Sequence, residues 1–188
     1  MKNYLSINSL IPSFNKVLNV PGDKSLSIRW VLLASQAIGR SKAYNLLESD
    51  DVISAIVSMR KLGVKILKRR SFYEINGVGL SGFRHKNNLN LNAGNSGTFA
   101  RLLCGTLAGN VKNVKVTGDS SLSKRDFSRV VKPLELFGIN IKTKKNKLPI
   151  TIKGSKYLRP IFYKEEKGSA QVKSAILLAS LNTPGQTI

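Results

Sequence analysis

Three turns in the sequence place small residues, hydroxyls and a basic side chain directly before an apolar stretch of helical periodicity. The first turn, residues 21–25 (PGDKS), contains Lys24 and Ser25, and Arg29 follows five residues after Lys24. The first backbone N–H groups of a helix have no partner within the helix and lie at the positive end of its dipole, so they bind anions readily. These residues therefore indicate a phosphate or carboxylate site, with a helix cap and a surface lysine as the structural alternative.

The second turn, residues 92–98 (NAGNSGT), supplies N–H donors and small residues at the start of a second apolar helix. Its glycines would let a ligand approach the backbone closely. Arg101 follows one helical turn later. A tight turn with a helix cap would explain the same residues without a ligand.

A third turn places the hydroxyl of Ser169 and the amide of Gln171, on either side of Ala170, at the start of another helix. Between the second and third turns, Arg125 could bind a phosphate or carboxylate through its planar guanidinium, or be a solvated charge at a helix start. Three equivalent turns on three equivalent units would meet at one end of a pseudo-symmetric domain. That arrangement favours one shared anion site over three unrelated helix caps.

The segments that contain these turns recur along the chain at residues 21–39, 93–109 and 168–185. Each has a Gly- or Ser-rich turn, a basic residue, an apolar helix with small residues and a final Gly. The basic residues are spaced by 72 in both steps: Arg29, Arg101 and Lys173. Equal spacing indicates duplication.

A second recurrence consists of an amphipathic helix that runs into a Gly and then an alternating strand, at residues 48–66 and 120–141. Gly63 and Gly138, 75 residues apart, fit the left-handed position at a helix C-terminus. With the short β-like stretches between them, each unit is predicted as strand, helix, strand, helix and strands. The third unit stops after its first helix, so we expect the chain to be incomplete.

The composition fits a folded protein with a strong basic bias. The chain has 188 residues, enough for one domain with a sizeable core, and 41% of them are hydrophobic. The 31 Lys and Arg residues against 10 Asp and Glu give a formal net charge of +21, which makes nucleic acid a candidate partner. The basic residues are scattered, however, and aromatic residues do not alternate with them as stacking platforms would. Composition alone allows an RNA-binding protein or an enzyme for small polyanions.

Several other classes of function are not indicated. No apolar run is long enough to cross a bilayer and no secretory signal is present, so we expect a cytoplasmic protein without a membrane partner. His85 and Cys104 are the single residues of their types, and we expect His85 on the surface and Cys104 in the core. The Gly-rich turns lack the spacing of dinucleotide and Walker motifs. We therefore expect no metal and no cofactor.

Four of these segments resemble motifs of the 5-enolpyruvylshikimate-3-phosphate synthase family, in the family's order and spacing. PGDKSLSIR is similar to PGDKS-x-S-x-R, and LNAGNSGTFARLL to L-x-x-GN-[SA]-GT-x-x-R. TGDSSLSKRD is similar to TGD-x-SL-x-KRP, and GSAQVKSAILLA to SAQVKSA-x-LLA. The sister family that acts on UDP-N-acetylglucosamine is a weaker match. The resemblance covers about residues 15–187 and implies the N-terminal portion of a family member.

The resemblance implies an α/β fold, the inside-out α/β barrel of the enolpyruvyl transferases, built from six βαβαββ repeats in two domains. About two and a half repeats would be present here. Residues 1–19 would be an N-terminal strand segment of the other, lower domain, and residues 20–188 an incomplete upper domain. The repeats of the upper domain would lie at about residues 20–88, 89–155 and 156–188, with the third truncated.

The implied reaction transfers the enolpyruvyl group of phosphoenolpyruvate to the 5-hydroxyl of shikimate 3-phosphate and releases phosphate, in the shikimate pathway to chorismate and the aromatic amino acids. By position, two sets of residues would bind the substrates. Those for shikimate 3-phosphate are Lys24, Ser25, Arg29, Ser169, Ala170 and Gln171. Those for phosphoenolpyruvate are Lys24, Gly97, Arg125 and Gln171, while Asn95 and Thr98 would shape the same turn.

The family's acid-base groups, an Asp and a Glu, come from the C-terminal half, so a longer natural chain or a separate polypeptide would have to supply them. We therefore expect this portion alone to be inactive. The chain also departs from the family's motifs at Ile28, usually His, at Trp30, usually small, and at Asp126, usually Pro. We expect Trp30 to affect local helix packing and Asp126 to reduce the charge of Arg125.

The alternative function is a non-catalytic protein, either decayed or repurposed as a basic domain that binds nucleic acid or another polyanion. Its main support is the net charge of +21. A decayed or repurposed domain would have no reason to retain the anion-binding turn residues together. Their retention makes an enzyme the favoured interpretation and nucleic acid the less favoured partner.

Overall fold

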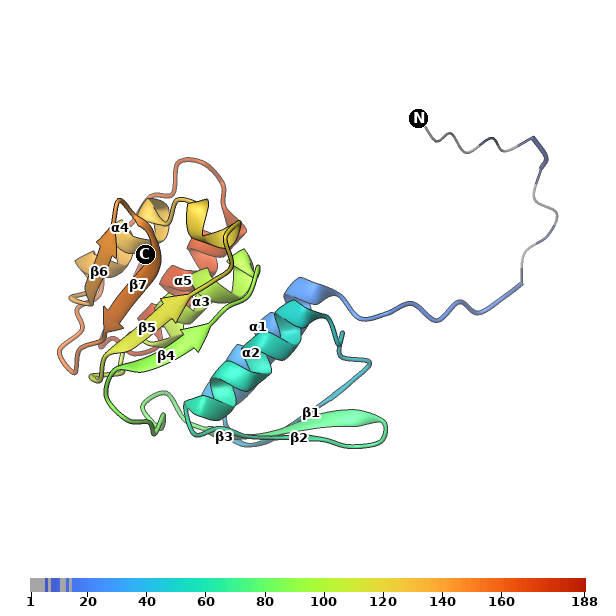
Figure 1. The fold of residues 1–188 in the computed structure, drawn as a ribbon, viewed down its shortest axis with the longest axis horizontal. Helices are drawn as coiled ribbons and strands as arrows, with labels where there is room; N and C mark the ends of the chain where they lie inside the picture. The colour runs from blue at the N-terminus through green and yellow to red at the C-terminus, as the bar shows by residue number, and fades with distance from the viewer. Residues whose placement is uncertain (1–5, 7, 11–12, 14) are drawn as a thin grey trace.

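The computed structural model describes residues 6, 8–10, 13 and 15–188 of the chain. Residues 15–23 form neither helix nor strand and lead away from the folded body (Figure 1). The strand segment predicted at residues 1–19 lies partly outside the described residues, and its place in a second domain stays a prediction.

The described helices and strands run from Lys24 to Ser180. The helices are α1 Lys24–Gln36, α2 Asp50–Lys61, α3 Gly97–Thr106, α4 Ser128–Leu136 and α5 Ala170–Ser180, with a short 3-10 helix, η1, at Leu122–Lys124. The strands are β1 Ile38–Tyr44, β2 Lys65–Lys68, β3 Phe72–Val78, β4 Leu89–Asn92, β5 Val114–Thr117, β6 Asn140–Lys144 and β7 Lys147–Lys153. The three turns predicted to bind anions therefore lead into α1, α3 and α5.

The strands form two sheets with helices packed on one face of each. The first sheet has the order β1-β3-β2, with β3 antiparallel to both neighbours. The second has the order β4-β5-β7-β6, in which β4 is parallel to β5 and the other pairs are antiparallel. Helices α1 and α2 cover the first sheet, and α3, α4 and α5 lie on the second (Figure 1). This arrangement, with α3 packed against both α1 and α5, agrees with the predicted inside-out α/β fold.

The second repeat is a complete βαβαββ unit, running from β4 through α3, β5, α4 and β6 to β7. The first repeat has the same order from α1 to β3, but residues 15–23 do not form the strand that would correspond to β4. The segment before α5 also forms no strand. In the second repeat, β4 pairs with the free edge of β5. In the first repeat, the corresponding segment before α1 is bonded near β1 by the Asn45 side-chain amide, which donates to the Val20 carbonyl (2.9 Å).

Equivalent helices of the repeats are spaced by 73 residues, because α1, α3 and α5 begin at that interval. Gly63 and Gly138 follow α2 and α4 with φ of 89° and 94°, as predicted for left-handed C-terminal positions. The predicted equivalence of three basic residues 72 apart is wrong, because they are the sixth, fifth and fourth residues of their helices: Arg29, Arg101 and Lys173. Each step of one residue turns a side chain by about 100° around the helix, so the three point in different directions.

The second amphipathic helix is shorter than predicted for residues 120–141. Helix α4 begins only at Ser128, whose backbone N–H (2.6 Å) and hydroxyl (3.0 Å) both donate to the carboxylate of Asp126. Asp119 accepts in the same way from the backbone N–H of Leu122 (2.7 Å) and begins η1. Short polar side chains offer the backbone these local alternatives to a continuous helix.

Helix α3 lies at the centre of the helical layer, and every residue in it is buried except Arg101. Gly105 lets α3 approach α5 closely, since a Cβ at this position would lie 2.0 Å from the backbone oxygen of Ala175. Cys104 is buried as predicted, and burial raises the pKa of its thiol to about 12. The core is therefore built around a helix whose N-terminus carries the second predicted anion turn.

We predict that Gly105→Ala lowers the free energy of unfolding by about 3 kcal/mol, because the added methyl must force two backbones apart. Gly39→Ala is the control: it meets no atom within 4 Å but holds a φ of +96°. Its cost should be only about 1 kcal/mol, from the left-handed backbone. Urea unfolding followed by circular dichroism compares the two, and equal losses would contradict the close α3–α5 approach.

Candidate functional site

The N-termini of α1, α3 and α5 are each capped by a side chain of the preceding turn. Asp23, Ser96 and Ser169 accept hydrogen bonds from first-turn N–H groups, those of Leu26 (2.7 Å), Phe99 (3.2 Å) and Val172 (3.4 Å). Each cap uses one of the first-turn donors, so the others can bind a ligand or water. The helix caps considered in the sequence are thus present and compatible with an anion site.

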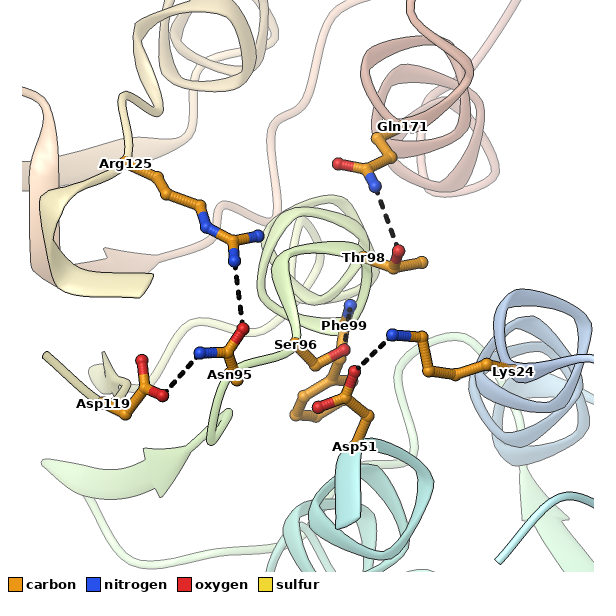
Figure 2. Close-up of polar contacts among 9 residues, drawn as sticks. All are labelled: Lys24, Asp51, Asn95, Ser96, Thr98, Phe99, Asp119, Arg125 and Gln171. Carbon is orange, nitrogen blue, oxygen red and sulfur yellow. Dashed lines mark hydrogen bonds and ion pairs between the residues drawn. The ribbon is translucent and has the colours of Figure 1, made fainter. Parts of the chain in front are cut away.

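Gln171 joins the start of α5 to the start of α3. Its side-chain Nε2 donates to the hydroxyl of Thr98 (3.0 Å; Figure 2). Its Oε1 accepts from Nη1 of Arg101 (3.0 Å). A guanidinium can only donate, so this amide has one orientation that satisfies both partners. Two of the predicted turns are therefore in direct contact.

Two guanidinium groups lie beside Gly97 at the N-terminus of α3. A Cβ built on Gly97 would lie 2.7 Å from Nη1 of Arg101 and 3.0 Å from Nη1 of Arg125. Nη2 of Arg101 donates to the backbone carbonyl of Asp126 (3.1 Å), and its guanidinium carbon lies 4.8 Å from the ring centroid of Phe127. Two cations beside the bare backbone of a helix N-terminus are the kind of arrangement that can bind an oxyanion.

The electrostatics of this arrangement favour the arrival of an anion. Arg101 is half-buried, and burial, followed by the nearby charge of Arg125, lowers its pKa from the usual value. Burial and the nearby Arg125 both disfavour the charged form of Arg101. An anion placed between the two guanidinium groups would stabilise both positive charges.

The parallel pairing of β4 and β5 places the turn of Asn95 beside the loop that carries Arg125. Asn95 Oδ1 accepts from Nη2 of Arg125 (3.0 Å), and its Nδ2 donates to the carboxylate of Asp119 (Figure 2). Loops that follow adjacent parallel strands are the usual place where ligands bind in α/β proteins. Here that edge holds Arg125 next to Gly97.

The residues of α1 form another side of the site. Nζ of Lys24 lies 3.0 Å from Oδ2 of Asp51, at the start of α2 (Figure 2). Ser25, beside it, is partly exposed. Arg29 lies deeper along the helix and donates to the hydroxyl of Ser174 in α5, so it links the first and third predicted units.

A cleft of about 320 Å³ lies beside the arginine pair, between the starts of α4 and α5. Its polar lining consists of Arg101, Asp126, Arg129, Ser169 and Gln171. The carboxylate of Glu165 pairs with Arg129 and also accepts from the backbone N–H of Ser169 (2.7 Å). The cleft has room for an anionic group beside Arg101, at the start of α5.

The three departures from the motifs are accommodated locally. The expected effect of Asp126 on Arg125 is not seen as a direct pair: the Asp126 carboxylate accepts from Ser128 at the start of α4, and its carbonyl accepts from Arg101. Trp30 is partly buried against the core, and α1 continues through it. Ile28 is fully buried in the same helix.

The sequence analysis assigned no substrate role to three functional candidates. Arg101 was noted one turn after the second anion turn but was not included among the substrate-binding residues, although its position four residues after Gly97 places it over the same helix start. Asp51 had a weaker signal, as an acidic residue in the first turn of α2. Asp119 stands in the TGD motif, but its partner Asn95 is 24 residues away and no local pattern pairs them.

The fold defines a class of α/β proteins built from repeated βαβαββ units, here with a candidate oxyanion site at the helix N-termini. The model of the EPSP synthase family (3-phosphoshikimate 1-carboxyvinyltransferase) matches residues 11–188. The chain therefore belongs to the EPSP synthase family.

Individual relatives agree with this assignment, and this chain covers only part of the length of each. The chain is 43% identical to a 3-phosphoshikimate 1-carboxyvinyltransferase of Streptococcus mutans, over 91% of this chain and 40% of that protein. It is 42% identical to one of Paracoccus denitrificans, over 90% and 38%. A solved structure of EPSP synthase from Acinetobacter baumannii superimposes with a TM-score of 0.85 at 40% identity, covering 90% of this chain and 39% of that one. The chain thus spans about two fifths of the relatives' length and matches their N-terminal portion. Among the described residues, no helix is both long and apolar enough to span a membrane.

We predict that Arg125→Ala weakens the binding of inorganic phosphate at Gly97 by about tenfold, the effect of losing one charge-assisted contact. Lys142→Ala, on the exposed side of β6, removes the same charge away from the site and should change affinity little. Phosphate titration followed by the Gly97 backbone N–H signal in NMR measures both. Equal weakening by the two variants would mean that phosphate responds only to net charge.

Proposed function

We propose that this chain forms the cationic half of an enzyme that transfers the enolpyruvyl group of phosphoenolpyruvate to the 5-hydroxyl of shikimate 3-phosphate and releases phosphate. The observation that carries the proposal is the placement of two guanidinium groups beside Gly97, with Gln171 bridging α5 to the same helix end. In this proposal Lys24, Gly97, Arg125 and Gln171 bind phosphoenolpyruvate. Shikimate 3-phosphate is bound by an overlapping set of residues from α1 and from the start of α5: Lys24, Ser25, Arg29, Ser169, Ala170 and Gln171.

The chemistry of the transfer explains why so many cations would be needed. Two polyanionic substrates must be held side by side, and their mutual repulsion must be offset before the reaction can begin. Fixed guanidinium and ammonium groups at helix N-termini do this without reorganising during the reaction. The half-buried Arg101 adds a further charge that water screens less than it screens Lys24, whose side chain is 52% exposed.

Proton transfer must come from other groups. The carboxylates that border the site among the described residues already have partners in this chain. Asp51 pairs with Lys24, Asp119 accepts from Asn95 and Leu122, and Asp126 accepts from Ser128. Glu165 pairs with Arg129, and Asp23 caps α1. We therefore propose that general acid and base are supplied by a further polypeptide segment, as a C-terminal half or as a separate chain.

The surface of α1 supports such a partner. Its third residue, Leu26, is 66% exposed, whereas the third residues of α3 and α5, Phe99 and Val172, are 0% and 2% exposed. Its tenth residue, Leu33, is 52% exposed, and an apolar cleft of about 330 Å³ runs between α1, α3 and α5. Exposed apolar surface of this kind marks an interaction site. We propose that a further unit of the same fold covers it.

We predict that the 188-residue chain alone catalyses no transfer, because the acid-base groups and the closed cleft are missing. The assay measures phosphate release that depends on both substrates. Adding the portion of the Streptococcus mutans relative beyond the region matched here should restore activity, with that portion alone as the control. Turnover by the chain alone would contradict the proposed division of the site.

We further predict weak binding of shikimate 3-phosphate to the chain, lost in Arg29→Ala and Gln171→Ala. Each variant removes a donor from the site, whereas His85→Ala changes a residue that contacts Lys86 and Asn110 and should bind like the parent. Titration calorimetry provides the comparison. Equal affinity in all three variants would refute the placement of the substrate.

Duplex DNA or RNA that still competes with shikimate 3-phosphate for the chain near physiological salt would favour the polyanion-binding alternative, since nonspecific binding of nucleic acid falls steeply with salt.

A further inference from the structure

We propose that Asp119 is a positioning residue for the anion site: acting through Asn95, it fixes the guanidinium of Arg125 beside Gly97. This inference rests on the proposed function, in which Arg125 binds a substrate anion. Asp119 itself would not touch the ligand.

The three side chains form a hydrogen-bonded series in which each polar atom acts either as a donor or as an acceptor. Arg125 Nη2 donates to Oδ1 of Asn95 (3.0 Å), and Nδ2 of Asn95 donates to Oδ2 of Asp119 (Figure 2). A guanidinium can only donate, and an ionised carboxylate can only accept. The amide between them therefore has one orientation that satisfies both, and the carboxylate sets it.

Asp119 is well suited to this role because its own position is fixed by the backbone. Its Oδ1 accepts from the N–H of Leu122 (2.7 Å), and its backbone N–H donates to the carbonyl of Gly94 (2.9 Å). The N–H of Leu122 and the amide of Asn95 lower the pKa of the Asp119 carboxyl, which stays ionised at neutral pH. The loop is also tightly packed, since a Cβ at Gly118 would lie 3.0 Å from the Gly94 carbonyl oxygen.

The indirect arrangement has a consequence for the charge of the site. A carboxylate bonded directly to Arg125 would orient it but would also neutralise the cation that the ligand needs. The neutral amide of Asn95 transmits the orientation and keeps the carboxylate one residue further away. Without it, Arg125 would be an exposed side chain repelled by Arg101, which already has its own acceptors.

The test compares two substitutions that remove the same charge from the same region. Asp119→Asn keeps an oxygen for the N–H of Leu122 but turns an NH₂ group toward the amide of Asn95, so the series of donors and acceptors fails. Asp126→Asn removes a carboxylate that bonds Ser128 and has no side-chain contact with Arg125. The side-chain oxygen of Asn can accept the same hydrogen bond from the Ser128 N–H, so α4 should remain intact.

The affinity for inorganic phosphate, followed by the Gly97 N–H signal in NMR, decides between two roles by its sign. If Asp119 only adds negative charge, Asp119→Asn should bind phosphate more tightly, as Asp126→Asn should. If Asp119 positions Arg125, Asp119→Asn should bind about tenfold more weakly despite the gain in net positive charge. Equal or tighter binding by Asp119→Asn would overturn the proposal.

A second readout does not depend on a ligand. The Arg125 side-chain N–H signals should shift and broaden in Asp119→Asn. They should return toward the parent in Asp119→Asn combined with Asn95→Asp, where the new amide donates to the new carboxylate and that carboxylate accepts from Arg125. Unchanged Arg125 signals in the single variant would also overturn the inference. Failure of the proposed function would look different: the parent chain itself would show no saturable phosphate response at Gly97.

Discussion

The burial of α3 is the constraint on which the rest of the molecule depends. Nine of its ten residues are buried, and it packs against α1 and α5. Each fully buried aliphatic or aromatic side chain contributes about 1.5–3 kcal/mol, so such a helix has little freedom to shift. Its N-terminus is therefore a fixed reference point, and the turn at Gly97 carries the arginine pair and the bridge to α5.

The exception, Arg101, shows how the fold holds like charges together. Its guanidinium and that of Arg125 approach the same glycine, and each is oriented by neutral oxygen atoms of amides and carbonyls. Neutral acceptors fix direction and partly replace lost hydration, but they leave the formal charge available to a ligand. Lys24 differs from the two arginines because its partner is charged: it pairs directly with Asp51, in a more exposed place. An arriving anion would have to compete with that carboxylate for Lys24.

Local patterns in the sequence predicted the elements of the fold well, because helix caps, apolar periodicity and C-terminal glycines act over a few residues. The starts of α1, α3 and α5 and the glycines after α2 and α4 were all found in this way. Residue spacing was less reliable for side-chain direction: a difference of one residue between the spacing of the basic residues and that of the helices made Lys173 look equivalent to Arg101. The start of α4 was misplaced because Asp119 and Asp126 capture backbone donors that a continuous helix would use.

The contacts that complete the site could not be predicted from the sequence, because they join residues far apart in the chain. Arg125 meets Asn95 across 30 residues and Gln171 meets Thr98 across 73, through strand pairing and helix packing that no local pattern specifies. The motifs did indicate which residues belong together, without saying how Asp119 or Asp51 takes part.

The openness of the site also limits what it can do alone. At 4 Å, two unit charges attract by about 1 kcal/mol in bulk water and about 4 kcal/mol where the effective dielectric constant is near 20. Lys24 is half exposed and Arg125 is exposed, so much of their attraction for an anion is lost to solvent. A second unit that covers the exposed leucines of α1 would also exclude water from the nearby helix starts. In the proposed enzyme, the missing portion would therefore strengthen the cations already present here, in addition to bringing the groups that transfer protons.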